Sequence, residues 1–433
     1  MEHDNPFISG NPVAPEQLIG RDKKLRFIAE RTKTGQSTFI TGSPRSGKTS
    51  VLKYFMVAPD EKRAQWLGNA DKLIFSYLDT SLCGLEFDEI QFWEQVLGPL
   101  QEHIIAQGSD SPLFQAYQTC QEKHFKLSEV EKLVAEIKQA NWRLVLLIDE
   151  FDSLLIDEFD RISYYQHPTF KDAIFAGLRR VVLGFKTQEA LAVVITSNIS
   201  RDQFNEKTKP FKTRSGSPYF NFTEETVLGA LPESEIDQLL GGDTHFTPDD
   251  RSFLKEIAGG HPYLLKVAAS RLWKELDEHK HEKLSEEQQQ GVREDLYTQV
   301  NDTLELIWQS WSPKMQKVFT SVAAQNPQLE KNLKKQGLDT KKILDQISSS
   351  KEELQYLKRS GFLIEDHQNT CGWRVYPGIF LEFVPDRLQT YRTKTDLPID
   401  VWLQENQRLP LGDRILQWIV RIIKAFVAKW FGL

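Results

Sequence analysis

The chain contains 433 residues, of which 40% are hydrophobic, 27% charged and 11% aromatic. This length exceeds what one compact core supports and predicts at least two domains, and the composition excludes an intrinsically disordered chain. The net charge of -7 argues against a broad electrostatic coating of nucleic acid. The three cysteines are widely spaced and form no C-x-x-C pair, so they indicate neither a disulfide framework nor a zinc site.

The N-terminal sequence and the cysteines both fit a cytoplasmic protein. No basic region followed by an apolar run opens the chain, so no secretory signal is expected. No internal stretch reaches the ~18 uninterrupted apolar residues of a membrane-spanning helix. We therefore expect a cytoplasmic location, and only the C-terminal tail raises the question of a peripheral contact with the inner membrane.

The first part of the chain predicts a lead-in followed by an α/β domain. Residues 1–35 contain a loop dense in Asn, Pro and Gly and then a helical pattern. The next segment, STFITGSPRSGKTSVLKYF, predicts a strand, a turn and a helix. Three more apolar runs, at 72–81, 144–152 and 190–198, are strand candidates with helical patterns between them. Such strands indicate a parallel sheet covered on both faces, which we place at 36–231.

After this domain the strand patterns stop and helical patterns take over. Residues 232–300 predict a helical lid that is interrupted by a Gly-Gly-His-Pro turn at 259–262. Residues 301–390 contain helix candidates and then two apolar-aromatic runs around a polar turn, which predicts a winged-helix domain. The remaining segment, 391–433, carries a predicted C-terminal amphipathic helix.

The strongest chemical signal is GSPRSGKT, which matches G-x-x-x-x-G-K-[ST] between a predicted strand and a predicted helix. The glycines allow backbone N–H groups to surround a β-phosphate at the positive end of the helix. Lys48 adds a full charge for the β and γ oxygens, which makes it a catalytic as well as a binding candidate, and the Thr49 hydroxyl would ligate Mg²⁺. The predicted phosphate site consists of Gly42, Ser43, Pro44, Arg45, Ser46, Gly47, Lys48, Thr49 and Ser50.

A second signal is LVLLIDEFD, an apolar run that leads into Asp149 and Glu150 at the expected carboxyl end of a buried strand. Ligands of open α/β sheets bind at that edge. We predict that Asp149 holds the metal through its water shell and that Glu150 is the general base that polarises the attacking water. Asp152 lies close in the sequence, and we expect a surface or supporting carboxylate there rather than a direct ligand.

The strand that ends in VVITSN places Thr196, Ser197 and Asn198 at the same edge. A neutral amide beside the γ-phosphate would position the attacking water, so Asn198 is a further catalytic candidate, with simple capping of the strand end as the alternative. Arg201 and Arg214 follow in loop-like sequence. Each is a candidate γ-phosphate sensor or arginine finger toward a neighbouring subunit, with an ordinary surface arginine as the alternative.

The combination of motifs resembles a known family. NPFISGNPVAPEQLIGRDKKL, TGSPRSGKTS, LLIDEFD and GGHPYLLK resemble, in order and spacing, the bacterial AAA-like ATPases grouped with the STAND signal-transducing NTPases, over roughly residues 5–385. The resemblance implies an AAA+/STAND-like α/β P-loop NTPase fold with a helical lid and a winged helix, and ATP or ADP as the ligand. It also implies a switch, held closed with ADP and opened by a trigger and ATP into oligomers, with a role in bacterial defence.

The family also implies site residues that spacing alone does not identify. Its lead-in lies against the nucleotide base, which implies that Gly20 and Arg21 form the rim of the adenine pocket. Its Gly-x-Pro turn approaches the nucleotide, which implies the same for Gly260 and Pro262, with His261 between them. Many such proteins carry long sensor repeats after the winged helix, whereas fewer than fifty residues follow here. We therefore expect either an unknown protein partner as the trigger or no separate sensor.

Two functions from different classes compete. The first is an ATP-dependent conformational switch that forms a homo-oligomer with ATP, in which the intact Glu150 predicts slow hydrolysis. The second is a DNA-binding AAA+ ATPase of the initiator or transposition-loader type that uses the winged helix. Residues 313–390 hold twelve Lys or Arg and nine Asp or Glu, a mixture that would neutralise few phosphates. The charge pattern favours the switch, and DNA binding stays open as the alternative.

The tail RILQWIVRIIKAFVAKWFGL, residues 414–433, predicts one amphipathic helix. At ~100° per residue, Arg414, Arg421 and Lys424 fall on one narrow stripe, opposite a broad apolar face with tryptophans. This pattern is typical of a helix that lies in a membrane interface, and the charges near its middle make spanning costly. Packing on protein is the equal alternative. We thus regard 411–433 as a candidate effector or assembly element that contacts either lipid or protein.

Overall fold

The computed structural model of the protein describes residues 5–7, 9–58, 60–68, 70–84, 86–106, 108–155, 170–208, 218–241, 245–279, 284–327, 329–331 and 350–395. Arg214 and the segment 396–433, with its predicted amphipathic helix, lie outside these residues. Within the described ranges, no helix combines the length and the apolar character needed to cross a membrane.

The centre of the first domain is a sheet of five parallel strands in the order β2–β3–β4–β1–β5. The strands are β1 (Ser37–Thr41), β2 (Leu73–Asp79), β3 (Arg143–Asp149), β4 (Leu191–Ser197) and β5 (Thr223–Val227). The predicted parallel sheet is therefore confirmed, and its first four strands lie in the predicted runs. The sequence does not predict β5, because TEETV is mostly polar and the strand lies at the sheet edge, where glutamates remain partly exposed.

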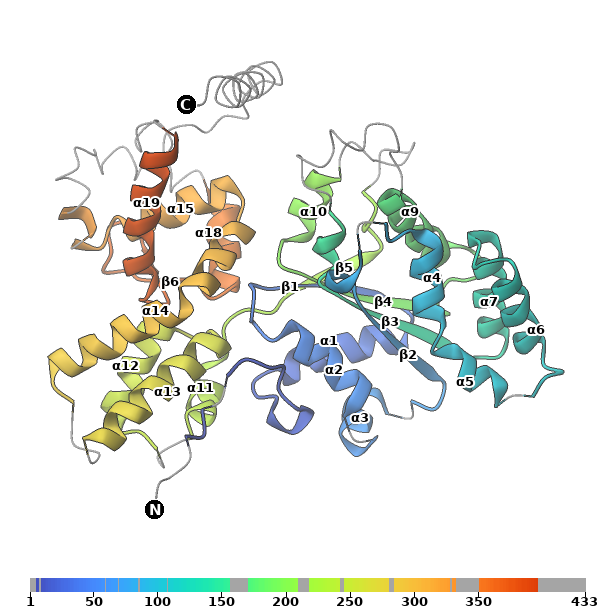
Figure 1. Ribbon diagram of the computed structural model, residues 1–433, viewed down its shortest axis with the longest axis horizontal. Helices are drawn as coiled ribbons and strands as arrows, with labels where there is room; N and C mark the ends of the chain where they lie inside the picture. Colours follow the sequence, from blue (N-terminus) through green and yellow to red (C-terminus); the bar gives the residue numbers. More distant parts are fainter. Residues whose placement is uncertain are drawn as a thin grey trace, which may run out of the picture.

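Helices cover both faces of this sheet (Figure 1). One face packs against α1 (Asp22–Lys33), α2 (Lys48–Val57) and α3 (Asp60–Leu67). The other packs against α4 (Glu89–Leu97), α5 (Leu100–Ile105), α6 (Pro112–Glu122), α7 (Leu127–Gln139), α9 (Phe170–Leu183) and α10 (Arg201–Lys207). Side chains alternate along β3, so Val145 and Leu147 join the first core and Leu146 and Ile148 join the second. Because both faces are covered, the carboxyl edge of the strands is left for a ligand.

Three short 3₁₀ helices complete the described part of this domain. They are η1 (Pro15–Gln17) in the lead-in, η2 (Thr80–Leu82) after β2, and η3 (Phe151–Leu154) after β3. The last two lie side by side, and Ser153 Oγ donates to Thr80 Oγ1 across them at 3.0 Å. The hydroxyl of Thr80 in turn donates to the backbone oxygens of Asp149 (3.0 Å) and Glu150 (2.8 Å), which fixes the turn after β3.

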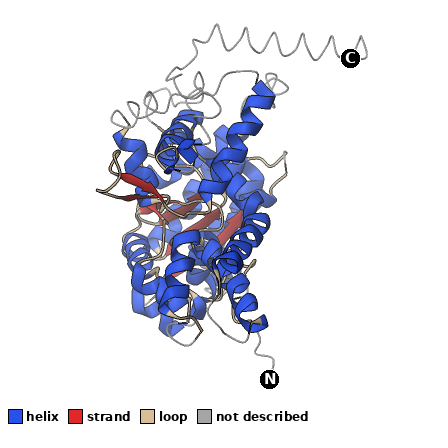
Figure 2. Cartoon of the chain, turned by 90° about the vertical axis from the view of Figure 1, so that its left-hand side faces the viewer, coloured by secondary structure: helices blue, strands red, loops and turns tan. Residues whose placement is uncertain are grey.

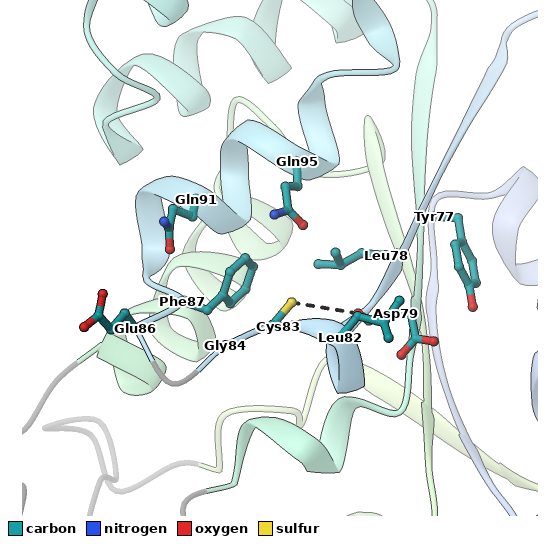
Figure 3. A pocket seen from close by; sticks show the side chains of 10 residues that line it. All are labelled: Tyr77, Leu78, Asp79, Leu82, Cys83, Gly84, Glu86, Phe87, Gln91 and Gln95. Atoms are coloured by element: carbon teal, nitrogen blue, oxygen red, sulfur yellow. Dashed lines mark hydrogen bonds between the residues drawn. The ribbon is translucent and has the colours of Figure 1, made fainter.

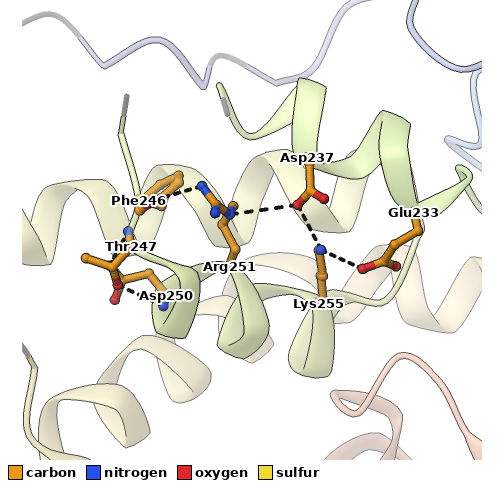
Figure 4. A network of polar contacts seen from close by, with 7 residues as sticks. All are labelled: Glu233, Asp237, Phe246, Thr247, Asp250, Arg251 and Lys255. Atoms are coloured by element: carbon orange, nitrogen blue, oxygen red, sulfur yellow. Dashed lines mark hydrogen bonds and ion pairs between the residues drawn. The ribbon is translucent and has the colours of Figure 1, made fainter. Parts of the chain in front are cut away.

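In the described residues after β5, four helices form the lid: α11 (Glu233–Leu239), α12 (Pro248–Ala258), α13 (Pro262–Glu278) and the first part of α14 (Glu286–Ser310). Ion pairs join α11 to α12 (Figure 4). Lys255 Nζ lies 2.5 Å from Glu233 Oε1 and 2.8 Å from Asp237 Oδ1, and Arg251 Nε lies 3.8 Å from Asp237. The acidic partners are exposed, so solvent screening limits each pair to about 1 kcal/mol or less.

The lid continues into the C-terminal domain through α14, which runs across the predicted boundary at residue 300. That domain contains α15 (Pro313–Ala323), α18 (Lys351–Arg359), the antiparallel pair β6 (Leu363–Glu365) and β7 (Trp373–Val375), and α19 (Phe380–Thr395). One apolar core extends through lid and C-terminal domain, and Figure 2 shows the helices that enclose it. A helix followed by a hairpin is what a winged helix requires, but 332–349 lie outside the described residues, so the winged helix stays a prediction.

A short linker, residues 228–232, joins the core to the lid and is tightly packed. A Cβ on Gly229 would collide with the backbone oxygen of Arg359 at the end of α18. The carbonyl of Gly260, in the turn before α13, accepts from the Leu231 N–H at 2.8 Å. The lid turn and the C-terminal domain therefore both dock on the strand-to-lid linker, close to the ligand edge of the sheet.

Candidate nucleotide site

The phosphate-binding loop, residues 42–47, joins β1 to α2 at the carboxyl edge of the sheet. Gly47 caps α2 in the left-handed region with φ of 96°, which a residue without a Cβ adopts without strain. Arg45 also has a positive φ, 62°, so the loop turns tightly before the helix. Backbone N–H groups and the positive N-terminus of α2 together form a site for a phosphate group.

Lys48 is buried at the first position of α2. Its Nζ donates to the carbonyl oxygens of Gly42 and Ser43, at 3.1 Å each, and to Asn198 Oδ1 at 2.8 Å. Burial lowers the pKa of Lys48, and the three carboxylates of the sheet edge oppose this shift. These carboxylates thus favour the charged amine, which is the form that would bind phosphate oxygens.

Asp149 ends β3 and is buried. Its carboxylate accepts hydrogen bonds from the hydroxyls of Tyr77 (3.1 Å) and Thr196 and from the N–H of Glu150 (3.2 Å). Burial, followed by the charge of Asp149, raises the pKa of Tyr77, so this tyrosine is a neutral donor. No motif in the sequence marks Tyr77; its signal is the position two residues before the end of β2, the strand paired with β3.

Glu150 lies at the turn after β3 with a positive φ of 50°, and its side chain is half-buried. Burial raises the pKa of Glu150, and the Lys48 ammonium opposes that shift. The Asn198 amide donates to Glu150 Oε2 at 2.5 Å, while its oxygen accepts from Lys48. Asp152 lies behind, where its Oδ1 accepts from the Asn198 backbone N–H at 3.1 Å. Asn198 therefore connects the candidate binding lysine with the candidate base.

The donors around the loop fit a Mg²⁺ ion that arrives with a nucleotide. Thr49 and Glu150 line the cavity at the loop, whereas Asp149 lies behind them and does not line it. A bound Mg²⁺ would take the Thr49 hydroxyl as a direct ligand and would be held by Asp149 through water. In the described part of the chain no three His, Cys, Asp or Glu side chains are grouped to hold an ion by themselves, so phosphate oxygens would supply further ligands.

The lid forms the opposite wall of the same cavity, which has a volume of about 300 Å³. Pro262 lines it together with Tyr263 and Lys266, two residues that the sequence analysis does not identify. Lys266 follows Pro262 by one helical turn, so helical periodicity could have indicated it. His261 does not line the cavity; it caps α13 and contacts Ser43 in the loop.

The N-terminal lead-in crosses from the lid to the core along the cavity. Phe7 is buried in the lid core and stacks on Phe246 with ring centroids 5.2 Å apart. The N–H of Val13 donates to Ser50 Oγ on α2 at 3.2 Å. Residues 9–13, which run between these two anchors, line the cavity. The cavity wall thus combines three segments that are far apart in the sequence.

Arg21 lines the cavity as well, and its guanidinium donates to the carbonyl oxygen of Ser46 at 3.0 Å. Burial lowers the pKa of Arg21 to about 10. Gly20 does not line the cavity and packs against the lid instead. It has φ of 72°, and a Cβ there would lie 2.8 Å from Leu231 and 2.9 Å from Glu235. Among the predicted loop residues, those from Arg45 to Ser50 line the cavity, and Gly42, Ser43 and Pro44 form the base of the loop.

Arg201 is not part of this cavity. Its guanidinium donates to the backbone oxygen of Thr223 at 2.6 Å, and its backbone N–H donates to Glu225 Oε1 at 3.0 Å. These contacts attach the start of α10 to β5, which fits a structural arginine. The other arginine candidate lies outside the described residues.

A second hollow, of about 520 Å³, lies at the end of β2 (Figure 3). Leu78 and Phe87 form its apolar side, and Gln91 lies on its exposed rim. It is connected to the nucleotide site only indirectly, because Tyr77 lines the hollow while its hydroxyl binds Asp149. This hollow lacks the phosphate-binding loop, so we place the nucleotide in the smaller cavity.

Together these features define a class of protein. The strand order, the loop after β1, the acidic pair after β3, the polar residues after β4 and the helical lid are those of the α/β P-loop ATPase fold of the AAA+ kind.

Solved structures share this fold at low sequence identity. The Walker-type ATPase PABY2304 of Pyrococcus abyssi is similar at 13% identity and a TM-score of 0.52, over 88% of this chain and 99% of that one. The ORC2 protein of Aeropyrum pernix, in its ADPNP–ADP complexes, is similar at 14% identity and a TM-score of 0.50, over 91% and 99% of the two chains. No protein-family model and no curated protein matches the sequence.

Proposed function

We propose that this chain is an ATP-binding molecular switch of the STAND type that hydrolyses ATP slowly and changes conformation or oligomerises when ATP is bound. The observation that carries this proposal is the composition of the cavity wall, to which the core, the lid and the lead-in all contribute. A ligand in this cavity would contact all three segments at once. A ligand shifts a conformational equilibrium only through such differential contacts, so the extra phosphate of ATP would favour one lid orientation.

The residues of the site have separable roles in this proposal. Loop N–H groups and Lys48 bind the phosphates, and Glu150 accepts a proton from the attacking water. Mg²⁺, held by Thr49 and through water by Asp149, would neutralise phosphate charge when bound. The Asn198 amide holds the Glu150 carboxylate in place through a hydrogen bond. The attacking water would compete with this amide for the carboxylate, and a γ-phosphate would compete for the amide. An amide partner that competes with the attacking water for the Glu150 carboxylate supports a slow, regulated rate.

The test is the mass of the full-length Glu150→Gln variant with ADP and with ATP, measured by light scattering. Glutamine keeps the shape and the Asn198 contact but cannot accept the proton, so ATP should remain bound and the oligomer should accumulate. Glu122→Gln, at an exposed position of α6, is the matched control and should hydrolyse ATP like the wild type. A Glu150→Gln chain that hydrolyses ATP at the wild-type rate, or keeps one mass with both nucleotides, would contradict the proposal.

The competing function is a DNA-binding AAA+ ATPase, which the hairpin after α18 would suit. The charges around α18 argue against strong DNA binding, because two of the cations there are paired. Lys358 pairs with Glu365 at 2.7 Å, and Lys314 pairs with Glu353 at 2.6 Å. Paired cations release fewer counterions from DNA. A strong, salt-dependent mobility shift of duplex DNA at physiological ionic strength would reverse this ranking.

The proposed output element is the stretch 411–433, which lies outside the described residues. Its sequence supports contact with either an anionic membrane or protein, and the trigger would be an unknown protein. Flotation of the full-length ATP-loaded protein with anionic liposomes separates the two contacts. Co-flotation that requires ATP supports a peripheral membrane role, whereas oligomers that stay with the aqueous fraction support assembly through protein contacts.

A further inference from the structure

His261 is the point at which the lid touches the phosphate-binding loop. The residue is buried and caps α13, where its Nδ1 accepts from the Leu264 N–H at 3.4 Å. Its Nε2 lies 3.1 Å from Ser43 Oγ and 3.2 Å from the backbone oxygen of Pro44. Because Nδ1 accepts a hydrogen bond, the ring proton is on Nε2. The imidazole therefore donates to the Pro44 carbonyl, with the Ser43 hydroxyl oxygen as a second partner.

The contact fixes the orientation of one peptide group in the loop. The peptide between Pro44 and Arg45 is not among the cis bonds of the described residues, so its C=O and N–H point in opposite directions. With the carbonyl toward His261, the Arg45 N–H points away from the lid imidazole. Arg45 lines the nucleotide cavity, whereas Pro44 and His261 do not. This orientation leaves the Arg45 N–H on the side away from the lid imidazole, free to donate to a phosphate.

The lid also contacts Arg45 directly, through its side chain. Arg45 has φ of 62°, a conformation that a non-glycine residue adopts at a cost and that needs support from its surroundings. Its guanidinium lies over the ring of Tyr263, 4.4 Å from the centroid. Tyr263 follows His261 by two residues in the first turn of α13. Two lid residues therefore hold two consecutive residues of the phosphate-binding loop.

From this geometry, and resting on the proposed nucleotide binding, we propose that His261 is a positioning residue for the phosphate-binding loop. Its Nε2–H holds the Pro44–Arg45 peptide in the orientation that binds a nucleoside diphosphate or triphosphate through its phosphates. The loop then binds phosphate well only while the lid is docked on it. Because such coupling is reciprocal, a phosphate in the loop stabilises the docked lid by the same factor.

Two substitutions separate this role from the capping of α13. His261→Asn keeps an acceptor at the position of Nδ1 and is a favourable N-cap, but its amide is too short to reach the loop. His261→Gln places an amide nitrogen at the position of Nε2 and restores the donor. Loss of a hydrogen bond to a buried loop carbonyl predicts a Kd about tenfold weaker for His261→Asn. His261→Gln should regain most of that affinity.

The experiment is calorimetric titration of the full-length wild type and both variants with ADP and with inorganic pyrophosphate, and thermal melting without ligand. Pyrophosphate carries the phosphates without the base and ribose. A weaker Kd for both ligands, with rescue by His261→Gln and an unchanged melting temperature for His261→Asn, therefore supports the inference. Wild-type affinity in His261→Asn overturns it. Equal weakening of ligand affinity in both variants, together with lower melting temperatures, also overturns it, because that result assigns His261 to the stability of the fold. A wild type that binds neither ligand overturns the proposed function, and this inference with it.

Discussion

The two walls of the nucleotide cavity are built in different ways. On the core side, Lys48, Glu150 and Asn198 come from the carboxyl ends of neighbouring parallel strands and from the loop, and they bond to one another. On the lid side, His261 and Tyr263 come from the start of α13, which meets the loop through two contacts. A five-residue linker joins the lid to the core. In the proposed switch, the groups for chemistry therefore lie on the sheet, and the groups that position the loop lie on the lid. Core changes should therefore abolish function, and lid changes should only tune it.

The largest effect is expected for Lys48→Ala. The substitution removes the cation that the loop aims at phosphate oxygens, and charge-assisted hydrogen bonds are worth up to about 3 kcal/mol each, so the Kd for ADP should weaken by about 100-fold or more. Lys23→Ala, an exposed position on α1, is the matched control and should bind ADP as the wild type does. Calorimetric titration measures both, and near-normal binding by Lys48→Ala would contradict a phosphate-binding role for the core side.

A smaller effect on a different quantity is expected for Asn198→Ala. Its amide joins Lys48 to Glu150, so its loss removes the hydrogen bond to Glu150 and one of the three hydrogen bonds of Lys48, at about 1–3 kcal/mol. We expect kcat for ATP hydrolysis to fall roughly tenfold, with the Kd for ADP changed less than that. Steady-state phosphate release and calorimetry measure the two quantities. Asn221→Ala, an exposed position before β5, should change neither. Lost ADP affinity with a normal kcat would show that Asn198 serves the loop rather than the base.

The core side could be predicted from the sequence because its information is local. The loop motif, the acidic pair and VVITSN each follow an apolar strand, and parallel strands bring their carboxyl ends to one edge. The exceptions have physical reasons. β5 is a polar edge strand, and Tyr77 acts through a cross-strand contact that no short motif records.

The lid side could be predicted only in part, because its contacts depend on how separate elements dock. The resemblance to a family indicated Pro262 and Arg21, but it also indicated Gly20, which packs on the lid instead of lining the cavity. No pattern in the sequence places Tyr263 over Arg45, since the two are joined by docking across more than 200 residues. Long-range pairs of this kind need the structure.

The third prediction uses pH to test His261, the lid residue that contacts the phosphate-binding loop. Burial lowers the pKa of His261 from 6.5 to about 3, and the charges of Arg21 and Lys48 add to this shift. At a pH between these two values, His261 binds a proton in the unfolded chain but not in the folded protein. The stabilisation is complete above pH 6.5 and is lost as pH falls below it, by about 1 kcal/mol between pH 6.5 and 5.5. The His261→Asn variant lacks this pH-dependent contribution to the free energy of unfolding. Urea unfolding of both chains at pH 7.5, 6.5 and 5.5 should show a steeper loss for the wild type, and parallel curves would mean that His261 is protonated in the fold.

The smallest effect is expected for Tyr263→Leu, which removes the ring beneath Arg45 but keeps an apolar side chain on α13. A partly exposed cation–π contact is worth about 0.5–1 kcal/mol, so the Kd for ADP should weaken about threefold. Tyr263→Phe retains the ring face and should bind ADP like the wild type, which separates the π contact from the hydroxyl. Equal weakening in both variants would assign the effect to the hydroxyl. A Tyr263→Leu effect as large as that of Lys48→Ala would mean that the lid wall binds phosphate itself, and the proposed division between a chemical core and a positioning lid would fail.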